Sequence, residues 1–309
     1  MVDVTAQPDN TKANVQKQKR TAAAPAKPLP IGQWAVYAVL LIGVVFSLLP
    51  FLWMVSWSVM TRPEVVVGRV VPASIQYENY IEAWQVAEFS NLMWNSVRIT
   101  GISIAGLLLF CIPAAYAFAR MKFWGRDVLF AITLATLMIP DIVTLIPNFL
   151  TVVWIHRFSV EFFGDWAGWL NNWPSLTVPF WASAFTIFLL RQFFAQIPDD
   201  LWDAARMDGA SHVQFLLRIV LPLSKAPVMT VSTFAFIGSW NSLLWPLLVI
   251  NGDAWKPIAL GLTNFVQNAG DEFHLQMAAA VIMIIPILIV YFFTQKQFTE
   301  GIYSGSFKG

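Results

Sequence analysis

Long apolar runs separated by short polar segments make up most of the chain. A helix of about 20 apolar residues crosses the hydrocarbon core of a bilayer. Six runs meet or approach that length, at residues 34–59, 99–119, 128–153, 176–194, 226–250 and 275–293. Tryptophans lie near many of the ends, as in an interfacial aromatic belt: Trp34, Trp53, Trp57, Trp154, Trp173, Trp181 and Trp245. The pattern predicts an all-α integral membrane protein with six transmembrane helices.

The polar stretch 198–222 lies between the fourth and fifth apolar runs and carries charges that do not sit in hydrocarbon. Pro198, followed by two aspartates, predicts a helix start, because acidic groups are favourable at the positive end of the helix dipole. Gly209 can take the left-handed conformation that ends a helix. Ser211 is the expected N-cap of a second helix that ends at Pro222. The stretch therefore predicts a helix, a turn and a second helix in water at one membrane face.

Basic residues give the orientation of the predicted spans. If the N-terminus is cytoplasmic, fourteen Lys and Arg residues fall on the cytoplasmic face and five on the other. Cytoplasmic loops carry an excess of positive charge, so both termini and the stretch 198–222 are expected in the cytoplasm. Residues 1–30 are rich in Ala, Pro, Gln and Lys and predict a disordered cytoplasmic tail. The apolar run that follows is too long for a signal peptide and predicts a retained span.

The stretch 198–222 resembles the cytoplasmic EAA loop of permease subunits of bacterial carbohydrate-type ABC importers. The resemblance is carried by Asp203-Ala204-Ala205, by Gly209 after three intervening residues, and by Ile219-Val220-Leu221-Pro222. It extends from the first apolar run to the C-terminal residues 301–309. One departure is Asp203, where the family usually has Glu, which keeps the charge and shortens the side chain by one methylene.

The resemblance implies a type I ABC importer permease fold over residues 31–309, in the bacterial cytoplasmic (inner) membrane. It implies a second homologous permease subunit, two ATPase subunits that bind ATP and Mg, and an extracytoplasmic solute-binding protein. The ATPase-coupling residues it implies are Leu201, Trp202, Asp203, Ala204, Ala205, Arg206, Asp208 and Gly209. Apolar Leu201, Trp202 and Ala205 are expected to supply the contact with the ATPase.

Polar groups inside two predicted spans are candidates for the solute path. Asp141 lies in the third run, where an ionisable group is costly and is expected to face a cavity or another helix. Amides pair with sugar hydroxyls, and indole rings stack on apolar sugar faces. The candidates are Asp141, Asn148, Trp240, Asn241 and Trp245. The alternatives are a structural hydrogen bond for Asp141 and close helix packing for the fifth span.

The segments predicted on the outer face are 62–95, 156–174 and 251–274. The first is compatible with short amphipathic helices on the membrane surface. The aromatic second segment has two interpretations, which are interfacial anchoring and contact with a binding protein. By resemblance, the third would reach toward the ligand cleft of that protein.

Composition agrees with a membrane protein, because hydrophobic residues are 57% of the chain, charged residues 12% and the net charge +1. No basic excess suggests nucleic acid. There is no phosphate-binding G-x-x-x-x-G-K-[ST] loop, no metal-ligand spacing among the three His residues, and no catalytic constellation. The chain is therefore expected to have no enzymatic site and no cofactor of its own.

The expected function is the permease subunit of an ATP-driven, binding-protein-dependent importer of a sugar or oligosaccharide. A polyol phosphate or another small polar solute is the alternative within importers. A self-powered secondary transporter is the alternative from another class. The sequence does not identify the solute.

Overall fold

The structure, a computed structural model, describes residues 31–268 and 272–306. The predicted tail, residues 1–30, lies outside the described residues, as do 269–271 and 307–309. The chain divides into two compact units, Met1–Leu52 and Trp53–Gly309, and each is described by itself. Within the described ranges the regular structure is helical and contains no strand, in agreement with the predicted all-α class.

The helices follow one another from the first span to the end of the chain. The first half comprises α2 (Ile31–Ser58), α3 (Arg62–Val66), α4 (Glu78–Val86), α5 (Phe89–Arg120), α6 (Arg126–Ala135), η1 (Thr136–Met138), α7 (Asp141–Phe163), η2 (Asp165–Ala167), α8 (Trp173–Thr177) and η3 (Val178–Phe180). The second half comprises α9 (Ala184–Phe194), α10 (Asp199–Met207), α11 (His212–Phe215), η4 (Leu216–Val220), α12 (Leu221–Leu223), α13 (Lys225–Trp240), α14 (Leu244–Val249), α15 (Ile258–Asn268) and α16 (Phe273–Ser306). Labels with η are 3-10 turns, except that η4 is a π-helical turn.

Four helices have the length and composition of a membrane span. They cover Gln33–Ser58, Phe89–Arg120, Asp141–Phe163 and Phe273–Gln295. Two further pairs qualify when each pair is taken as one bent span: Trp173–Phe180 with Ala184–Phe194, bent by 44°, and His212–Leu223 with Lys225–Trp240, bent by 82°. The described chain therefore carries four to six spans, which is consistent with the predicted six. The first is one continuous helix that contains Pro50.

The third predicted span, 128–153, is divided at Pro140. Ile139 is extended (φ −90°, ψ 119°), and α7 begins at Asp141 and continues to Phe163. The physical reason is that proline disfavours a helical conformation for the residue before it. Asp141 is therefore the first residue of a helix rather than a mid-span residue. Because α7 extends beyond residue 153, the first part of the predicted outer loop 156–174 is helical.

The fifth predicted span, 226–250, is divided between Trp240 and Leu244. In a continuous helix, the ring of Pro246 would clash with the carbonyl of Ser242, four residues earlier. The sequence prediction of one continuous span overlooked this proline. The fourth predicted span is likewise interrupted, between Phe180 and Ala184.

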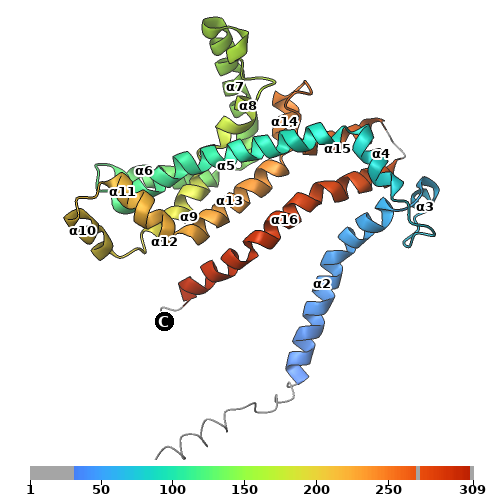
Figure 1. The fold of residues 1–309 in the computed structure, drawn as a ribbon, viewed down its shortest axis with the longest axis horizontal. Coiled ribbons are helices and arrows are strands. Elements are labelled where there is room, and N and C mark those ends of the chain that lie inside the picture. The colour runs from blue at the N-terminus through green and yellow to red at the C-terminus, as the bar shows by residue number, and fades with distance from the viewer. Residues whose placement is uncertain (1–30, 269–271, 307–309) are drawn as a thin grey trace, which may run out of the picture. The chain divides into compact units, whose positions relative to one another are not determined.

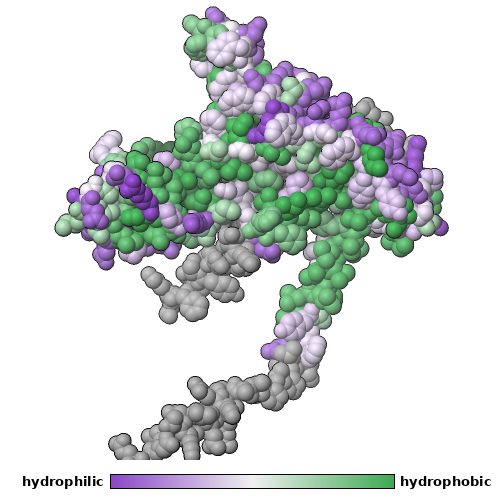
Figure 2. All heavy atoms as spheres, viewed as in Figure 1, coloured by the Kyte–Doolittle hydropathy of each residue, from purple (hydrophilic) through white to green (hydrophobic). Residues whose placement is uncertain are grey.

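Four long helices run side by side in the second unit (Figure 1). α5 packs against α9 and α13, α13 also packs against α9 and α16, and α4 and α15 contact one end of α16. One buried cluster joins the start of α5 to α15 and α16, and another joins the end of α5 to α9, α10 and η4. Figure 2 shows hydrophobic residues along the flank of these helices and hydrophilic residues around α10 and around α4 and α15. This distribution fits a membrane domain with a lipid-facing belt and two ends that are exposed to water.

Candidate functional site

A cleft of about 870 Å³ opens where three helix interruptions meet. Pro140 and Asp141 line it from the η1–α7 junction, Ala182 and Ser183 from the η3–α9 junction, and Asn241 to Leu243 from the α13–α14 junction. Non-helical backbone at membrane depth is tolerated where it lines a cavity, because its free N–H and C=O groups then meet water or a polar solute. The convergence of three interruptions makes this cleft the strongest candidate for a polar solute path.

Four of the five residues predicted for the solute path line this one cleft, although they come from two separate segments of the chain. They are Asp141, Asn148, Asn241 and Trp245. The side chains of Asp141, Asn148 and Asn241 are exposed. Among the described residues, none hydrogen-bonds to the side-chain amide of Asn148 or Asn241, so both amides are available to a solute.

Trp240, the fifth predicted residue, lies elsewhere. Its side chain is buried, stacks on Phe236 with ring centroids 5.4 Å apart, and donates from Nε1 to the Met283 carbonyl at 3.1 Å. The sequence prediction placed it beside Asn241 in the path, but the last turn of α13 directs this indole toward α16. Trp245 is also buried, and its Nε1 donates to the Ser175 carbonyl at 2.7 Å, so it offers the cleft ring surface and no donor.

The cleft has one acidic side chain and no basic one. Its ionisable lining consists of Asp141 alone, since no Lys, Arg or His lines the cleft within the described chain. A site without cations gives a carboxylate or phosphate no partner for its charge. The walls that this chain contributes therefore offer hydrogen-bonding groups and no cationic partner for an anion.

A smaller cavity of about 210 Å³ shares Phe180, Ser183, Ser242 and Trp245 with the cleft. Ser103 of α5 and Ser239 of α13 add hydroxyls to its wall. Neither serine is among the residues that the sequence predicted for the solute path. The signal was present: Ser96, Thr100 and Ser103 recur at the spacing of one helix face, and all three are buried.

The stretch 198–222 has the predicted local structure. α10 starts directly after extended Pro198, and Gly209 is left-handed with φ 76°. The Ser211 hydroxyl accepts from the Gln214 amide, and the Gln214 side chain accepts from the Ser211 amide, which completes a capping box. The predicted end at Pro222 is one residue early, because α12 includes Leu223. Pro222 lies in the first turn of α12, where proline is tolerated, and the helix ends at Ser224 instead.

Two of the three apolar residues expected to meet an ATPase instead pack on this chain. Ala205 is buried, and Trp202 stacks on His212 with ring centroids 4.3 Å apart and contacts Phe215 edge-on at 5.0 Å. The helical period turns these residues inward and leaves another face of α10 exposed. That outer face carries Asp200, Leu201, Asp203, Ala204, Met207 and Asp208. Met207, 89% exposed, was not among the predicted coupling residues.

The stretch is tied to the body of the second unit through α5. Arg120 donates to the Ile197 carbonyl at 2.8 Å and pairs with Asp199 at 3.0 Å. The Tyr116 hydroxyl is hydrogen-bonded to His212 Nδ1 at 2.8 Å. The start of α10 and the start of α11 are therefore both bonded to one long helix, α5.

A second polar pocket, of about 460 Å³, lies at the other end of α5. Arg98 lies between two indoles, 4.3 Å from the Trp255 ring and 5.7 Å from the Trp94 ring, and it donates to Asn95. Its Nε is buried and has no hydrogen-bond partner within the described chain. The sequence did not predict this pocket, because Arg98 and Trp255 are distant along the chain.

Comparisons with known proteins give matches to membrane components of transport systems. A family model described as "Binding-protein-dependent transport system inner membrane component" matches residues 108–302. The chain is 29% identical over 265 residues to the lactose transport system permease protein LacG of Rhizobium radiobacter, covering 86% of this chain and 93% of LacG. It is 30% identical over 280 residues to the trehalose transport system permease protein SugB of Mycobacterium tuberculosis, covering 89% and 97%.

The chain is also 28% identical over 284 residues to the sn-glycerol-3-phosphate transport system permease protein UgpE of Brucella abortus, covering 88% and 96%. Among solved structures, it resembles a chain in the crystal structure of a bacterial ABC transporter involved in the import of the acidic polysaccharide alginate. The TM-score is 0.75 and the identity 25%, over 88% of this chain and 99% of that chain.

Proposed function

This chain belongs to the family of binding-protein-dependent transport system inner membrane components, and on that premise we propose that it is the permease subunit of an ATP-driven importer of a sugar or oligosaccharide. The observation that carries the proposal is the cleft where three helix interruptions bring Asp141, Asn148 and Asn241 together. These side chains accept and donate hydrogen bonds, as sugar hydroxyls require.

The neutral character of the solute is supported by the walls of the cleft. The relatives LacG and SugB are named for lactose and trehalose, which are neutral disaccharides, whereas UgpE is named for a phosphate ester. The cleft carries one carboxylate and no cation among its described lining residues. This charge pattern favours a neutral sugar over the polyol phosphate that the sequence left open as an alternative.

Two partner ATPase subunits, which bind ATP and Mg, supply the energy for import. The exposed outer face of α10 is the docking surface for one of them. Leu201, Ala204 and Met207 give this face apolar contact, and Asp200, Asp203 and Asp208 give it charge. The excess of basic residues on this face supports a cytoplasmic position for α10. A second, homologous permease closes the other side of the cleft.

A solute-binding protein delivers the sugar on the opposite face of the membrane. The pocket around Arg98, between the start of α5 and residues 253–256, lies at the end of α5 remote from α10. Its partly unpaired guanidinium and the exposed Trp94 suit an interface with a protein, because Arg and Trp are enriched in binding hot spots.

The test is uptake by purified proteins in liposomes. The chain is purified from its native membrane with the subunits that co-purify, these are identified by mass spectrometry, and the complex is reconstituted with its binding protein and a radiolabelled disaccharide. We expect uptake that needs ATP, the binding protein and both permeases. Uptake by this chain alone would instead support the self-powered transporter.

A further inference from the structure

The loop between α2 and α4 exposes apolar side chains immediately after a membrane span. Residues 61–76, here called the valine strap, contain α3 and a turn at Gly68, whose φ is 74°. Five β-branched side chains of the strap are more than half exposed: Val66 66%, Val67 80%, Val70 63%, Val71 73% and Ile75 59%. A group of exposed apolar side chains of this kind marks a surface that another phase or molecule covers.

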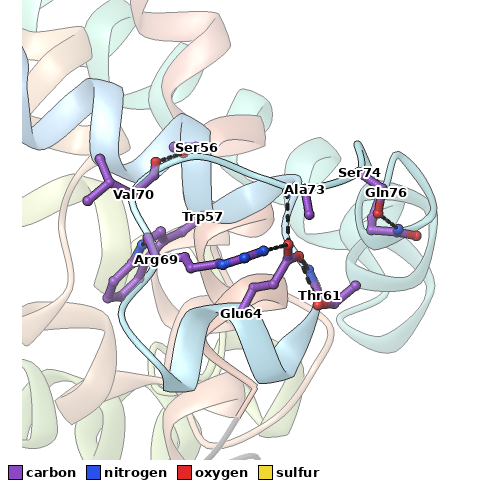
Figure 3. Close-up of polar contacts among 9 residues, drawn as sticks. All are labelled: Ser56, Trp57, Thr61, Glu64, Arg69, Val70, Ala73, Ser74 and Gln76. Atoms are coloured by element: carbon purple, nitrogen blue, oxygen red, sulfur yellow. Dashed lines mark hydrogen bonds and ion pairs between the residues drawn. The ribbon is translucent and has the colours of Figure 1, made fainter.

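One carboxylate holds the valine strap in its shape. Glu64 Oε2 accepts from the amide and the hydroxyl of Thr61, both at 2.9 Å, and Oε1 accepts from the Ala73 amide at 2.9 Å and from Arg69 at 3.3 Å. Figure 3 shows these bonds converging on one side chain. They lower the pKa of Glu64 from 4.5 to about 2, the backbone amides of Thr61 and Ala73 being the largest causes. Several polar groups that would otherwise need water are thus satisfied within the strap.

The strap folds back along the last turn of α2. The Trp57 indole donates to the Arg69 carbonyl at 3.0 Å, and the Ser56 hydroxyl donates to the Val70 carbonyl at 2.6 Å (Figure 3). A further bond runs from the Gln76 amide to the Val59 carbonyl at 2.9 Å. The carbonyls of Arg69 and Val70 therefore lie at the level of residues 56 and 57, inside the span Gln33–Ser58 rather than beyond its end.

That level is the membrane–water interface. Trp53 and Trp57 pack edge-on with ring centroids 5.6 Å apart at the end of the span, and tryptophans at span ends sit at the lipid headgroups. The strap meets the conditions for such a position, since many of its polar groups are internally bonded, its valines are exposed and Arg69 is half-exposed.

From this geometry we infer that the valine strap is a lipid anchor, which inserts its exposed valines into the headgroup–acyl boundary beside the first span. The occupant of this apolar surface is the bilayer, because the surface continues the exposed apolar end of α2. Trp53 and Val55, which lie in that end and in the same unit as the strap, are 44% and 47% exposed. The anchor fixes the depth of the first span in the membrane, and it works independently of which solute is imported.

Spin labels test this inference directly. Cys111 is the only cysteine and is fully buried, so a nitroxide on a cysteine introduced by Val67→Cys or Val70→Cys reports on that position, with the unsubstituted chain as the labelling control. The complex is placed in nanodiscs of phosphatidylethanolamine and phosphatidylglycerol. The reference is a label introduced by Glu78→Cys at an exposed position of α4. Compared with it, we expect both strap labels to collide several-fold more often with oxygen and several-fold less often with a water-soluble nickel chelate.

Nickel-chelate access at Val67 equal to that at Glu78 would overturn the lipid anchor. Protection from both reagents, with cross-linking to another subunit, would overturn it in favour of a protein partner. Glu64→Gln should raise nickel access at both labels, because an amide cannot accept all four bonds. Glu82→Gln on α4 is the matched control. These measurements do not depend on transport, so a negative result for the lipid anchor is distinguishable from a failure of the proposed importer function.

Discussion

Two carboxylates illustrate how surroundings decide the role of a residue. Glu64 is largely enclosed, its side chain 12% exposed, and all its bonding capacity is used within a loop. Asp141 is exposed and lines the cleft at the three helix interruptions, and no ion pair involving it is found among the described residues. The first is a structural clamp, whereas the second is available to a passing solute.

Replacing Asp141 tests the cleft at the level of one functional group. A hydrogen bond to a charged group contributes about 1.5–3 kcal/mol, so losing it lowers a rate or affinity by ~10- to 100-fold. Asp141→Asn should reduce disaccharide uptake by about this factor while the complex still assembles. Asp165→Asn, on η2 and absent from the cleft lining, should leave uptake unchanged. Equal effects of the two changes would remove Asp141 from the path.

The pH dependence of Glu64 tests the clamp. Its pKa in the folded chain, about 2, lies below the ordinary value of 4.5. A lowered pKa means that the clamp contributes its full stabilisation above pH 4.5, and that this contribution is lost as the pH falls toward 2. Carbon NMR of glutamate-labelled protein should show one carboxyl titrating well below the others, and Glu64→Gln should remove that signal. Titration of this carboxyl near its ordinary value would contradict the bonding described.

Side-chain direction was the part of the site that the sequence predicted least well. The amide and indole side chains of Trp240, Asn241 and Trp245 predicted a polar path here, but not that Asn241 would line the cleft while Trp240 turned to α16. The same limit applies to α10, where Trp202 and Ala205 face inward. Rotation of a helix about its axis is set by the segments packed against it, and a single sequence does not name them.

At the scale of elements, prolines mark where helices break. The extended residue before Pro140 and the clash that Pro246 imposes on Ser242 separate the segments that line the cleft. Both breaks could be predicted from local chemistry. In contrast, Pro50 and Pro286 lie inside continuous helices, so a proline alone does not decide between a break and a tolerated position. The surrounding packing makes that decision.

Gly209 tests the turn that orients α10. At φ 76° a side chain costs about 1–2 kcal/mol, and a Cβ added to Gly209 would have no atom within 4 Å, so the penalty is conformational rather than steric. Gly209→Val should keep the complex in the membrane but uncouple ATP hydrolysis from uptake. Gly252→Val is the control, because Gly252 is equally open and has no positive φ. Normal sugar-stimulated uptake by the Gly209 variant would count against a role of this turn in coupling.

Gly106 tests the packing of α5 against the segment before α9. A Cβ at this position would lie 2.1 Å from Trp181 Nε1, so Gly106→Ala must displace a large ring. Such overpacking costs about 1–3 kcal/mol, which denaturation monitored by tryptophan fluorescence would measure. Gly101→Ala, on the same helix with nothing within 4 Å, should be neutral or slightly stabilising. A neutral Gly106→Ala would mean that the ring is not packed there.

At the scale of the whole molecule, the class was predictable and the assembly was not. Hydropathy and the charge distribution predicted an all-helical membrane protein, because a bilayer leaves few alternatives to the helix. The choice of α5 as the helix that contacts α9, α13 and α15 depends on contacts between residues distant in sequence. The same applies to Arg98 and Trp255, which no local pattern connects.

The near-right angle at Ser224, where His212–Leu223 meets Lys225–Trp240 at 82°, determines the kind of motion that α13 can make. A displacement along the axis of the first segment acts across the axis of α13, so α13 pivots instead of sliding. Its 16 residues make an arm of ~24 Å at about 1.5 Å per residue. Rotating that arm by ~4° shifts its far end, beside Asn241, by ~1.7 Å, more than half the length of a hydrogen bond. If Asn241 binds the solute as proposed, a small rotation at the base of α13 is therefore enough to make or break its hydrogen bond to the solute.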